Sequence, residues 1–145
     1  MEIARSFREL NTYKRAREGS RKVFEVSKTF PKEETFSLTN QIRRSSRAIG
    51  AILAEAWGRR RYKAAFINKL DESMSEAQET QAWLDHALDC EYINALQHQE
   101  LDQLWQQVGG MLSNMISRAD DFCKNAPDHS FVREAGVEYD APENG

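Results

Sequence analysis

Apolar positions recur every three or four residues along most of the chain, which is the spacing of helices that bury one face. The first such pattern runs from about Leu10 to Thr29 and ends before Pro31, which cannot continue a helix. A second begins near Ser37, a favourable N-cap, and stops at Gly58, a residue suited to a left-handed C-terminal position. The residues expected to face inward on these two helices are Tyr13, Ala16, Ser20, Val23, Phe24 and Ser27, then Leu38, Ile42, Ser45, Ile49, Ile52, Leu53 and Ala56.

A third pattern extends from about Arg61 to Asp89, and a fourth opens at Asn94, where Gln97 three residues later predicts a capping box. The fourth has the most regular spacing of apolar residues in the chain. The expected inward residues are Phe66, Leu70, Met74, Ala77, Leu84 and Leu88, then Leu101, Leu104, Trp105, Val108, Met111, Leu112, Met115, Ile116, Ala119 and Phe122.

The four patterns predict an all-α fold. Helices of roughly 20 to 29 residues span about 30–43 Å, and short loops between them force neighbours to run antiparallel. We therefore expect an antiparallel up-down-up-down four-helix bundle over residues 1–123. Residues 124–145, in which proline and glycine alternate with acids, are expected to form a disordered, flexible acidic tail.

Length and composition narrow the class of protein. With 145 residues, 40% hydrophobic and 30% charged, the chain is long enough for one domain with a core. No apolar run is long enough to span a membrane, and no basic-then-apolar segment opens the chain. Two cysteines, Cys90 and Cys123, do not make a disulfide framework, so a cytoplasmic protein is expected.

Residues that would carry catalysis are missing from the sequence pattern. There is no glycine-rich phosphate loop, no nucleophile elbow, and no Glu-x-x-His pair of the kind that holds di-iron in bundles. His86 and Cys90 lie one helical turn apart, but two ligands do not complete a zinc site. We therefore expect no enzyme, no metal and no cofactor.

The net charge of −3 conceals a strong asymmetry between the two halves. Residues 1–63 contain 16 Lys and Arg against 7 Asp and Glu, whereas residues 64–145 contain 4 against 16. The halves thus carry net charges of +9 and −12. Such segregation indicates either a surface that binds a polyanion or self-assembly between opposite charges.

The second helix concentrates the positive charge. No acid occurs between Glu34 and Glu55, and the helical projection places Arg43, Arg44 and Arg47 about 140° from the apolar stripe. The small residues Ala51, Ala54 and Gly58 follow on the same outward face, where another helix could approach closely. This pattern predicts an interface, either with another subunit or with a polyanion.

Two further features belong with that interface. Arg59, Arg60, Arg61 and Lys63 place four cations in five residues at the junction of the second and third helices. They are candidates for phosphate binding, although a basic cap on the helix C-terminus explains them equally well. Trp83 projects far from the apolar stripe of its helix, and an exposed tryptophan is typical of an assembly surface.

With these residues in view, the sequence resembles a family of small bacterial four-helix-bundle proteins encoded by intervening sequences in large-subunit ribosomal RNA genes. The resemblance runs from Phe7 to about Phe122 and includes relatives known as accessory variability proteins of diversity-generating retroelements. The stretches that carry it are 7–10 (FREL), 30–34 (FPKEE), 38–46 (LTNQIRRSS), Ala54-Glu55, Gly58-Arg59, Phe66, Leu70, Glu79, Leu84, Tyr92 and Met111-Leu112.

The resemblance implies a homopentamer whose five bundles surround an axial channel. It also implies, from the accessory relatives, a non-enzymatic protein that binds nucleic acid and a reverse transcriptase. Arg43, Arg44 and Arg59 match family positions, whereas Arg47, Arg60, Arg61 and Lys63 are added here from their charge alone.

Together these observations predict a non-enzymatic homo-oligomer that binds RNA or DNA backbones, without sequence specificity, through the second helix and the junction that follows it. Arg43, Ala51, Ala54, Gly58 and Trp83 are the expected subunit contacts. The alternative is a protein–protein scaffold in which arginines of the second helix pair with acids of the third across a subunit boundary.

Overall fold

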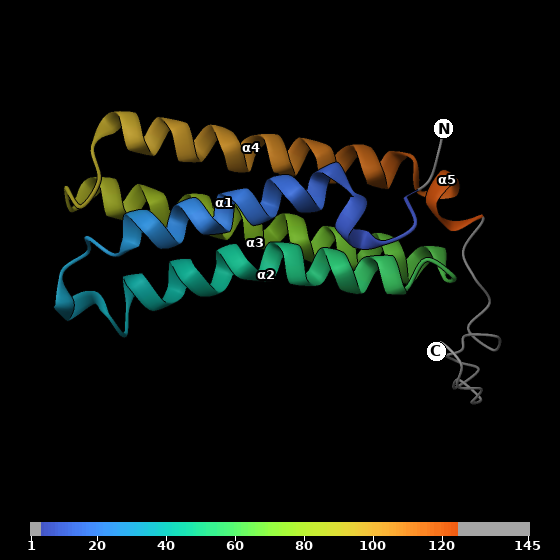
Figure 1. The fold of residues 1–145 in the computed structure, drawn as a ribbon, viewed down its shortest axis with the longest axis horizontal. Helices are drawn as coiled ribbons and strands as arrows, with labels where there is room; N and C mark the ends of the chain where they lie inside the picture. The colour runs from blue at the N-terminus through green and yellow to red at the C-terminus, as the bar shows by residue number, and fades with distance from the viewer. Residues whose placement is uncertain (1–3, 125–145) are drawn as a thin grey trace.

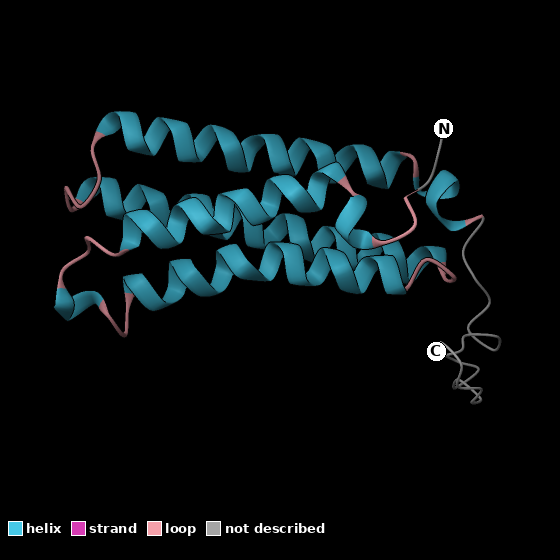
Figure 2. Ribbon diagram, viewed as in Figure 1, coloured by secondary structure: helices cyan, strands magenta, loops and turns pink. Residues whose placement is uncertain are grey.

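The computed structural model describes residues 4–124, and within this range the regular structure is entirely helical (Figure 2). Four long helices account for most of it: α1 (Asn11–Ser27), α2 (Leu38–Gly58), α3 (Lys63–Asp89) and α4 (Ala95–Ser117). Two short 3₁₀ turns, η1 (Phe7–Glu9) and η2 (Lys32–Glu34), and a terminal α5 (Ala119–Cys123) complete the description. The prediction of an all-α chain is confirmed. The predicted tail at 124–145 lies, beyond Lys124, outside the described residues.

The long helices lie lengthwise beside one another, and consecutive helices run in opposite directions (Figure 1). Contacts join α1 to α2, α2 to α3, α3 to α4 and α4 back to α1. Each helix therefore buries one side against two neighbours. No described helix is long and apolar enough to cross a membrane.

The core follows the predicted stripes on α2 and α4 closely. Ile42, Ile49 and Leu53 of α2, together with Trp105 and Leu112 of α4, are inaccessible to solvent. On α1 the prediction is less accurate. Ser27 is buried as expected, but the side chain of Thr12 is also buried, while Tyr13, Ser20 and Phe24 lie at the edge of the core.

On α3 two polar residues are buried that the apolar pattern passes over. Ser73 donates a hydrogen bond to the Ile49 carbonyl at 2.8 Å, and the hydroxyl oxygens of Thr80 and Ser45 lie 2.8 Å apart. Burial of these hydroxyl groups costs little free energy because each forms a hydrogen bond. Met74, which was expected in the core, is only partly buried.

The helix ends show how local chemistry sets the boundaries. Asn94 and Gln97 form the predicted capping box at α4. Ser37 occupies the N-cap position of α2, but its side chain makes no capping bond. The Glu34 carboxylate instead accepts hydrogen bonds from the Ser37 hydroxyl at 2.6 Å and the Leu38 amide at 3.3 Å.

Two predictions about where and how the helices end are wrong. Gly58 is the last residue of α2, as predicted, but its φ is not positive, and the chain leaves the helix through a turn in which the Arg59 amide bonds to the Ala56 carbonyl at 2.9 Å. The stripe that reached Phe122 is not one helix, because it breaks at Arg118 between α4 and α5. Ala119 and Phe122 remain buried beyond the break, and the Phe122 ring lies 5.9 Å from that of Phe66.

Candidate functional site

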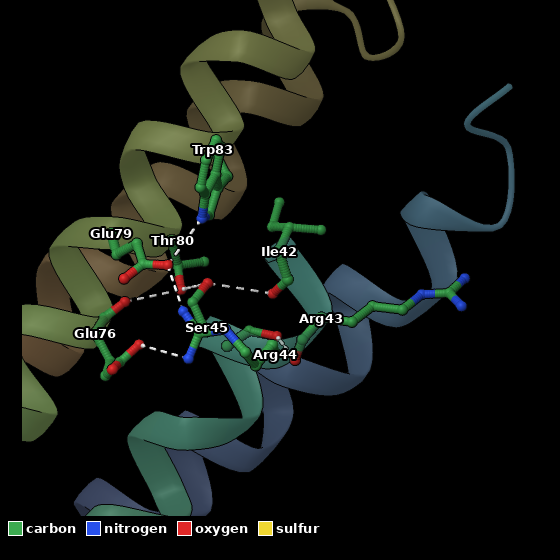
Figure 3. Close-up of polar contacts among 9 residues, drawn as sticks. Ile42, Arg43, Arg44, Ser45, Glu76, Glu79, Thr80 and Trp83 are labelled. Atoms are coloured by element: carbon green, nitrogen blue, oxygen red, sulfur yellow. Dashed lines mark hydrogen bonds and ion pairs between the residues drawn. The ribbon is translucent and has the colours of Figure 1, made fainter. Parts of the chain in front are cut away.

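The three arginines of α2 do not share one unpaired surface. Arg43 reaches toward α1, where its Nε donates a 2.7 Å hydrogen bond to the Ser27 hydroxyl. Arg44 reaches the other way, toward α3, and its side chain is 50% exposed. Figure 3 shows the two side chains leaving α2 in these different directions. The helical projection placed both on one side of the helix, away from its apolar stripe. The structure separates them, because neighbouring residues of a helix point about 100° apart and α2 has a neighbour on each side.

Arg44 pairs with acids of its own chain. One guanidinium nitrogen lies 2.6 Å from the Glu79 carboxylate and the other 3.8 Å from that of Glu76 (Figure 3). Burial, together with the neighbouring Glu79 carboxylate, raises the pKa of Glu76 above its ordinary value. The contact between an arginine of the second helix and acids of the third, which the scaffold alternative placed between subunits, is thus made within one chain.

Trp83 joins the same group. Its indole N–H donates to Glu79 at 3.0 Å, and its ring packs against that of His86 with the centroids 5.7 Å apart. The side chain is partly buried against the core. The view of Trp83 as an exposed residue far from the apolar stripe is therefore corrected: its polar edge has a partner on its own helix.

Three cations gather around one aromatic ring where α1 and α2 meet. The Phe24 ring centroid lies 4.7 Å from the Arg43 guanidinium carbon, 5.6 Å from that of Arg47 and 4.9 Å from the Lys28 ammonium. We call Phe24, Lys28, Arg43 and Arg47 the α1–α2 basic cluster. Its cations are stabilised in part by the electron-rich face of the ring.

A single acid accompanies this cluster in the described structure. Glu25 lies 3.3 Å from Lys28, and both side chains are more than half exposed. Arg47 is exposed and makes no ion pair with any described residue. The α1–α2 basic cluster thus combines an aromatic surface with an excess of positive charge, the combination that nucleic-acid-binding surfaces use.

Phe24 was predicted to lie in the core, and no sequence pattern singled out Lys28. Their signal was present, because residues 24 and 28 are one turn apart on the helix edge that must face α2. Recognising it requires knowing that Arg43 and Arg47, also one turn apart, lie opposite.

The junction after α2 is a separate group. Arg59 follows Arg47 by twelve positions, which corresponds to about 18 Å along the helix axis. Arg60 folds back so that its guanidinium carbon lies 3.6 Å from the Trp57 ring centroid while its Nε donates to the Trp57 carbonyl at 2.9 Å. Burial lowers the pKa of Arg60.

The other junction residues differ in their surroundings. Lys63 opens α3 and lies 2.7 Å from the Asp120 carboxylate of α5, a pairing that raises the pKa of the lysine. Arg59 is exposed, and the guanidinium of Arg61 lies 5.4 Å from the Tyr62 ring centroid. The sequence motif at 59–63 therefore does not form one uniform group of solvent-facing cations.

The predicted subunit contacts are spread over two surfaces. Ala51 and Gly58 are exposed on α2, Ala54 is partly buried, and a side-chain carbon added at Gly58 would have nothing within 4 Å. This side of α2 leaves room for the close approach of another helix. Arg43 and Trp83 lie on opposite sides of α2, toward α1 and α3 respectively.

The fold and these surfaces define a small all-helical protein whose conspicuous chemistry is charge. A family model described as 23S rRNA-intervening sequence protein matches residues 8–114. The chain belongs to that family.

Comparison with solved structures gives a consistent result. The chain is similar to a protein of unknown function from the S23 ribosomal protein family of Bacteroides thetaiotaomicron, with a TM-score of 0.66 and 29% sequence identity. The match covers 72% of this chain and 97% of that one. No curated protein matches the chain.

Proposed function

We propose that this protein is a non-enzymatic, up-down-up-down four-helix bundle that binds RNA or DNA backbones through the α1–α2 basic cluster. The observation that carries the proposal is the gathering of Lys28, Arg43 and Arg47 around Phe24, where Glu25 is the one acid of residues 4–124 that pairs with the cluster. Cations bind phosphates and an aromatic ring stacks on bases without regard to sequence. The exposed Arg59 of the junction adds a second contact along the same strand in this proposal.

Arg44 and Lys63 contribute less to nucleic-acid binding in this proposal than the sequence pattern predicted. Each already has a carboxylate partner, at 2.6 Å and 2.7 Å. Exposed ion pairs are worth at most about 1 kcal/mol, so phosphate could displace them, but the exchange leaves a carboxylate beside the phosphate.

A salt titration tests the proposal. Binding of unrelated RNA and DNA oligonucleotides is followed by fluorescence anisotropy from low to physiological salt. If about five phosphates are contacted, log affinity falls with log salt with a slope of about −4. Arg43→Ala/Arg47→Ala should make the slope shallower by about two and weaken all sequences alike.

Lys69→Ala/Arg118→Ala provides a matched control, since it removes the same charge from elsewhere on the molecule. The basic-cluster variant should lose much more affinity than this control. Equal losses would reduce the effect to net charge, and an affinity independent of salt would reject the proposal.

A second candidate function is assembly, and the distribution of charge over the fold favours it. Counted from the sequence, α1 and α2 carry net charges of +3 and +2, whereas α3 and α4 carry −4 and −2. Because α1 contacts α2 and α3 contacts α4, the molecule has a basic side and an acidic side. Docking of one on the other is a head-to-tail contact, which closes into rings such as the homopentamer that the family resemblance implies.

Light-scattering mass tests assembly. Ala51→Trp, on the exposed side of α2, should lower the mass if the row of small residues Ala51, Ala54 and Gly58 is the contact, and an unchanged mass would reject this row as the contact. Charge reversal at Arg43 and Arg44 then shifts mass under the scaffold alternative and nucleic-acid affinity under the first proposal. The accessory variability proteins imply a reverse transcriptase as a partner. Co-elution of the two proteins from a sizing column tests this interaction, and separate elution would reject it.

A further inference from the structure

Four polar side chains face one another across the contact between α3 and α4. Gln81 and Asp85 lie one turn apart on α3, and His98 and Asp102 lie one turn apart on α4. The His98 Nε2 is 2.8 Å from an Asp85 carboxylate oxygen, and the Gln81 amide donates to an Asp102 carboxylate oxygen at 3.2 Å. α3 ends at Asp89 and α4 begins at Ala95, so the group lies near the loop that joins these two helices, which Figure 1 shows at one end of the molecule.

The spacing of three of these residues suits a metal ion. One ligand atom from each of Asp85, His98 and Asp102 lies within 4.8 Å of the others. Ligands around tetrahedral zinc bond at about 2.0–2.2 Å and are therefore about 3.3 Å apart. Small side-chain rotations are enough to bring the three atoms around one ion.

The surroundings of these three side chains also suit the binding of a metal ion. The His98 side chain is 20% exposed, which holds its ring in place, whereas that of Asp85 is 67% exposed and leaves the site open to water as a further ligand. Within residues 4–124, no lysine or arginine forms an ion pair with Asp85 or Asp102. The two helices that supply the ligands are also the two of the four long helices with net negative charge.

We propose that Asp85, His98 and Asp102 form a Zn²⁺ site that bridges α3 and α4, with Gln81 as a positioning residue that orients the Asp102 carboxylate. An imidazole with two carboxylates favours zinc over magnesium and calcium, which prefer oxygen ligands alone. Bound zinc replaces the hydrogen bond between His98 and Asp85 by bonds to one ion and so clamps the two helices together. Spacing along the chain offered only the pair His86 and Cys90, because the ligands here come from two helices and meet only in the folded chain.

Isothermal titration of the full-length, chelator-treated protein with ZnCl₂ tests this site. We expect uptake of one ion per chain at this site, a higher thermal midpoint with zinc, and no comparable effect of MgCl₂. His98→Ala and Asp102→Asn should each remove this uptake and the zinc-dependent rise of the midpoint. Gln81→Ala should weaken binding by about tenfold, as the loss of an outer-shell partner does.

His86→Ala and Cys90→Ser are matched controls, because they remove exposed zinc-binding groups elsewhere on or beside α3. Both should retain the full response. The proposal is overturned if the native chain takes up no zinc, if uptake survives in both His98→Ala and Asp102→Asn, or if the controls abolish it. Circular dichroism of each variant without metal establishes that the fold is intact.

Discussion

Gly19 of α1 lies directly against the indole ring of Trp105 on α4. A side-chain carbon added at Gly19 would come 2.7 Å from Trp105 Cζ2 and 2.5 Å from Leu104 Cδ2. Trp105 itself is inaccessible to solvent and fills the space that the glycine leaves. The close approach of α1 to α4 at this level therefore depends on a residue without a side chain.

Gly19→Ala should destabilise the protein. Overpacking a filled core costs about 1–3 kcal/mol, which exceeds the roughly 1 kcal/mol that alanine gains over glycine in a helix. Urea unfolding measures the difference. Gly110→Ala is the control, because Gly110 lies inside α4 with nothing within 4 Å of an added carbon, and it should stabilise by up to about 1 kcal/mol. Similar effects at both positions would show that the contact with Trp105 is not restrictive.

The buried hydroxyl pair between α2 and α3 should show energetic coupling. Thr80→Val keeps the shape of the side chain but removes the 2.8 Å hydrogen bond to Ser45, and we expect it to cost about 1–2 kcal/mol. Ser45→Ala should cost a similar amount. The double variant should cost less than the two together, since neither hydroxyl is left without its partner. Additive losses in denaturant unfolding would mean that the two groups act independently.

Stability should decline at both ends of the pH range because Glu34 and Tyr92, which are hydrogen-bonded to each other, both titrate with shifted pKa values. The Ser37 hydroxyl, the Tyr92 hydroxyl and the Leu38 amide all donate to Glu34 and lower the pKa of that carboxyl. A lowered folded-state pKa contributes stability above the unfolded-state pKa, and this contribution is lost as pH falls through the folded-state value. Glu34→Gln should therefore flatten the acid limb of the curve of unfolding free energy against pH.

The hydrogen bond from the Tyr92 hydroxyl to Glu34 raises the pKa of Tyr92 from 10.0 to about 12. The sign is opposite: the contribution is complete below pH 10.0 and is lost as pH rises toward about 12. Tyr92→Phe should flatten the alkaline limb while leaving much of the acid limb. Tyr13→Phe is the control, and an unchanged alkaline limb in Tyr92→Phe would contradict the assignment.

Glu91→Gly should stabilise the turn between α3 and α4. Glu91 has a φ of 61°, and it is the one non-glycine residue with positive φ in the described part of the chain. The left-handed conformation costs a residue with a side chain about 1–2 kcal/mol, and glycine removes this cost. Part of that gain in stability is lost again, because glycine gives the unfolded chain more conformational freedom. A net gain of up to about 1 kcal/mol is expected in thermal unfolding. Glu100→Gly, at an exposed position within α4, should instead destabilise the protein by a similar amount.

The sequence by itself determined the helical elements. Apolar spacing located α2 and α4 to within a few residues, and Asn94 with Gln97 specified the start of α4, because both signals lie within a few residues of chain. It could not locate the break at Arg118, where the apolar stripe continues through a change of helix, nor the buried Ser73 and Thr80, whose partners are on another helix.

Only the tertiary structure decided how the charges are distributed. The count of cations in the first half was correct, but projection of one helix cannot show which arginine meets an acid. Arg44 meets Glu79 because α3 lies on that side of α2, and Arg43 meets Phe24 because α1 lies on the other. Which side chains come together across neighbouring helices depends on the packing of those helices, and the periodicity of a single helix does not contain that information.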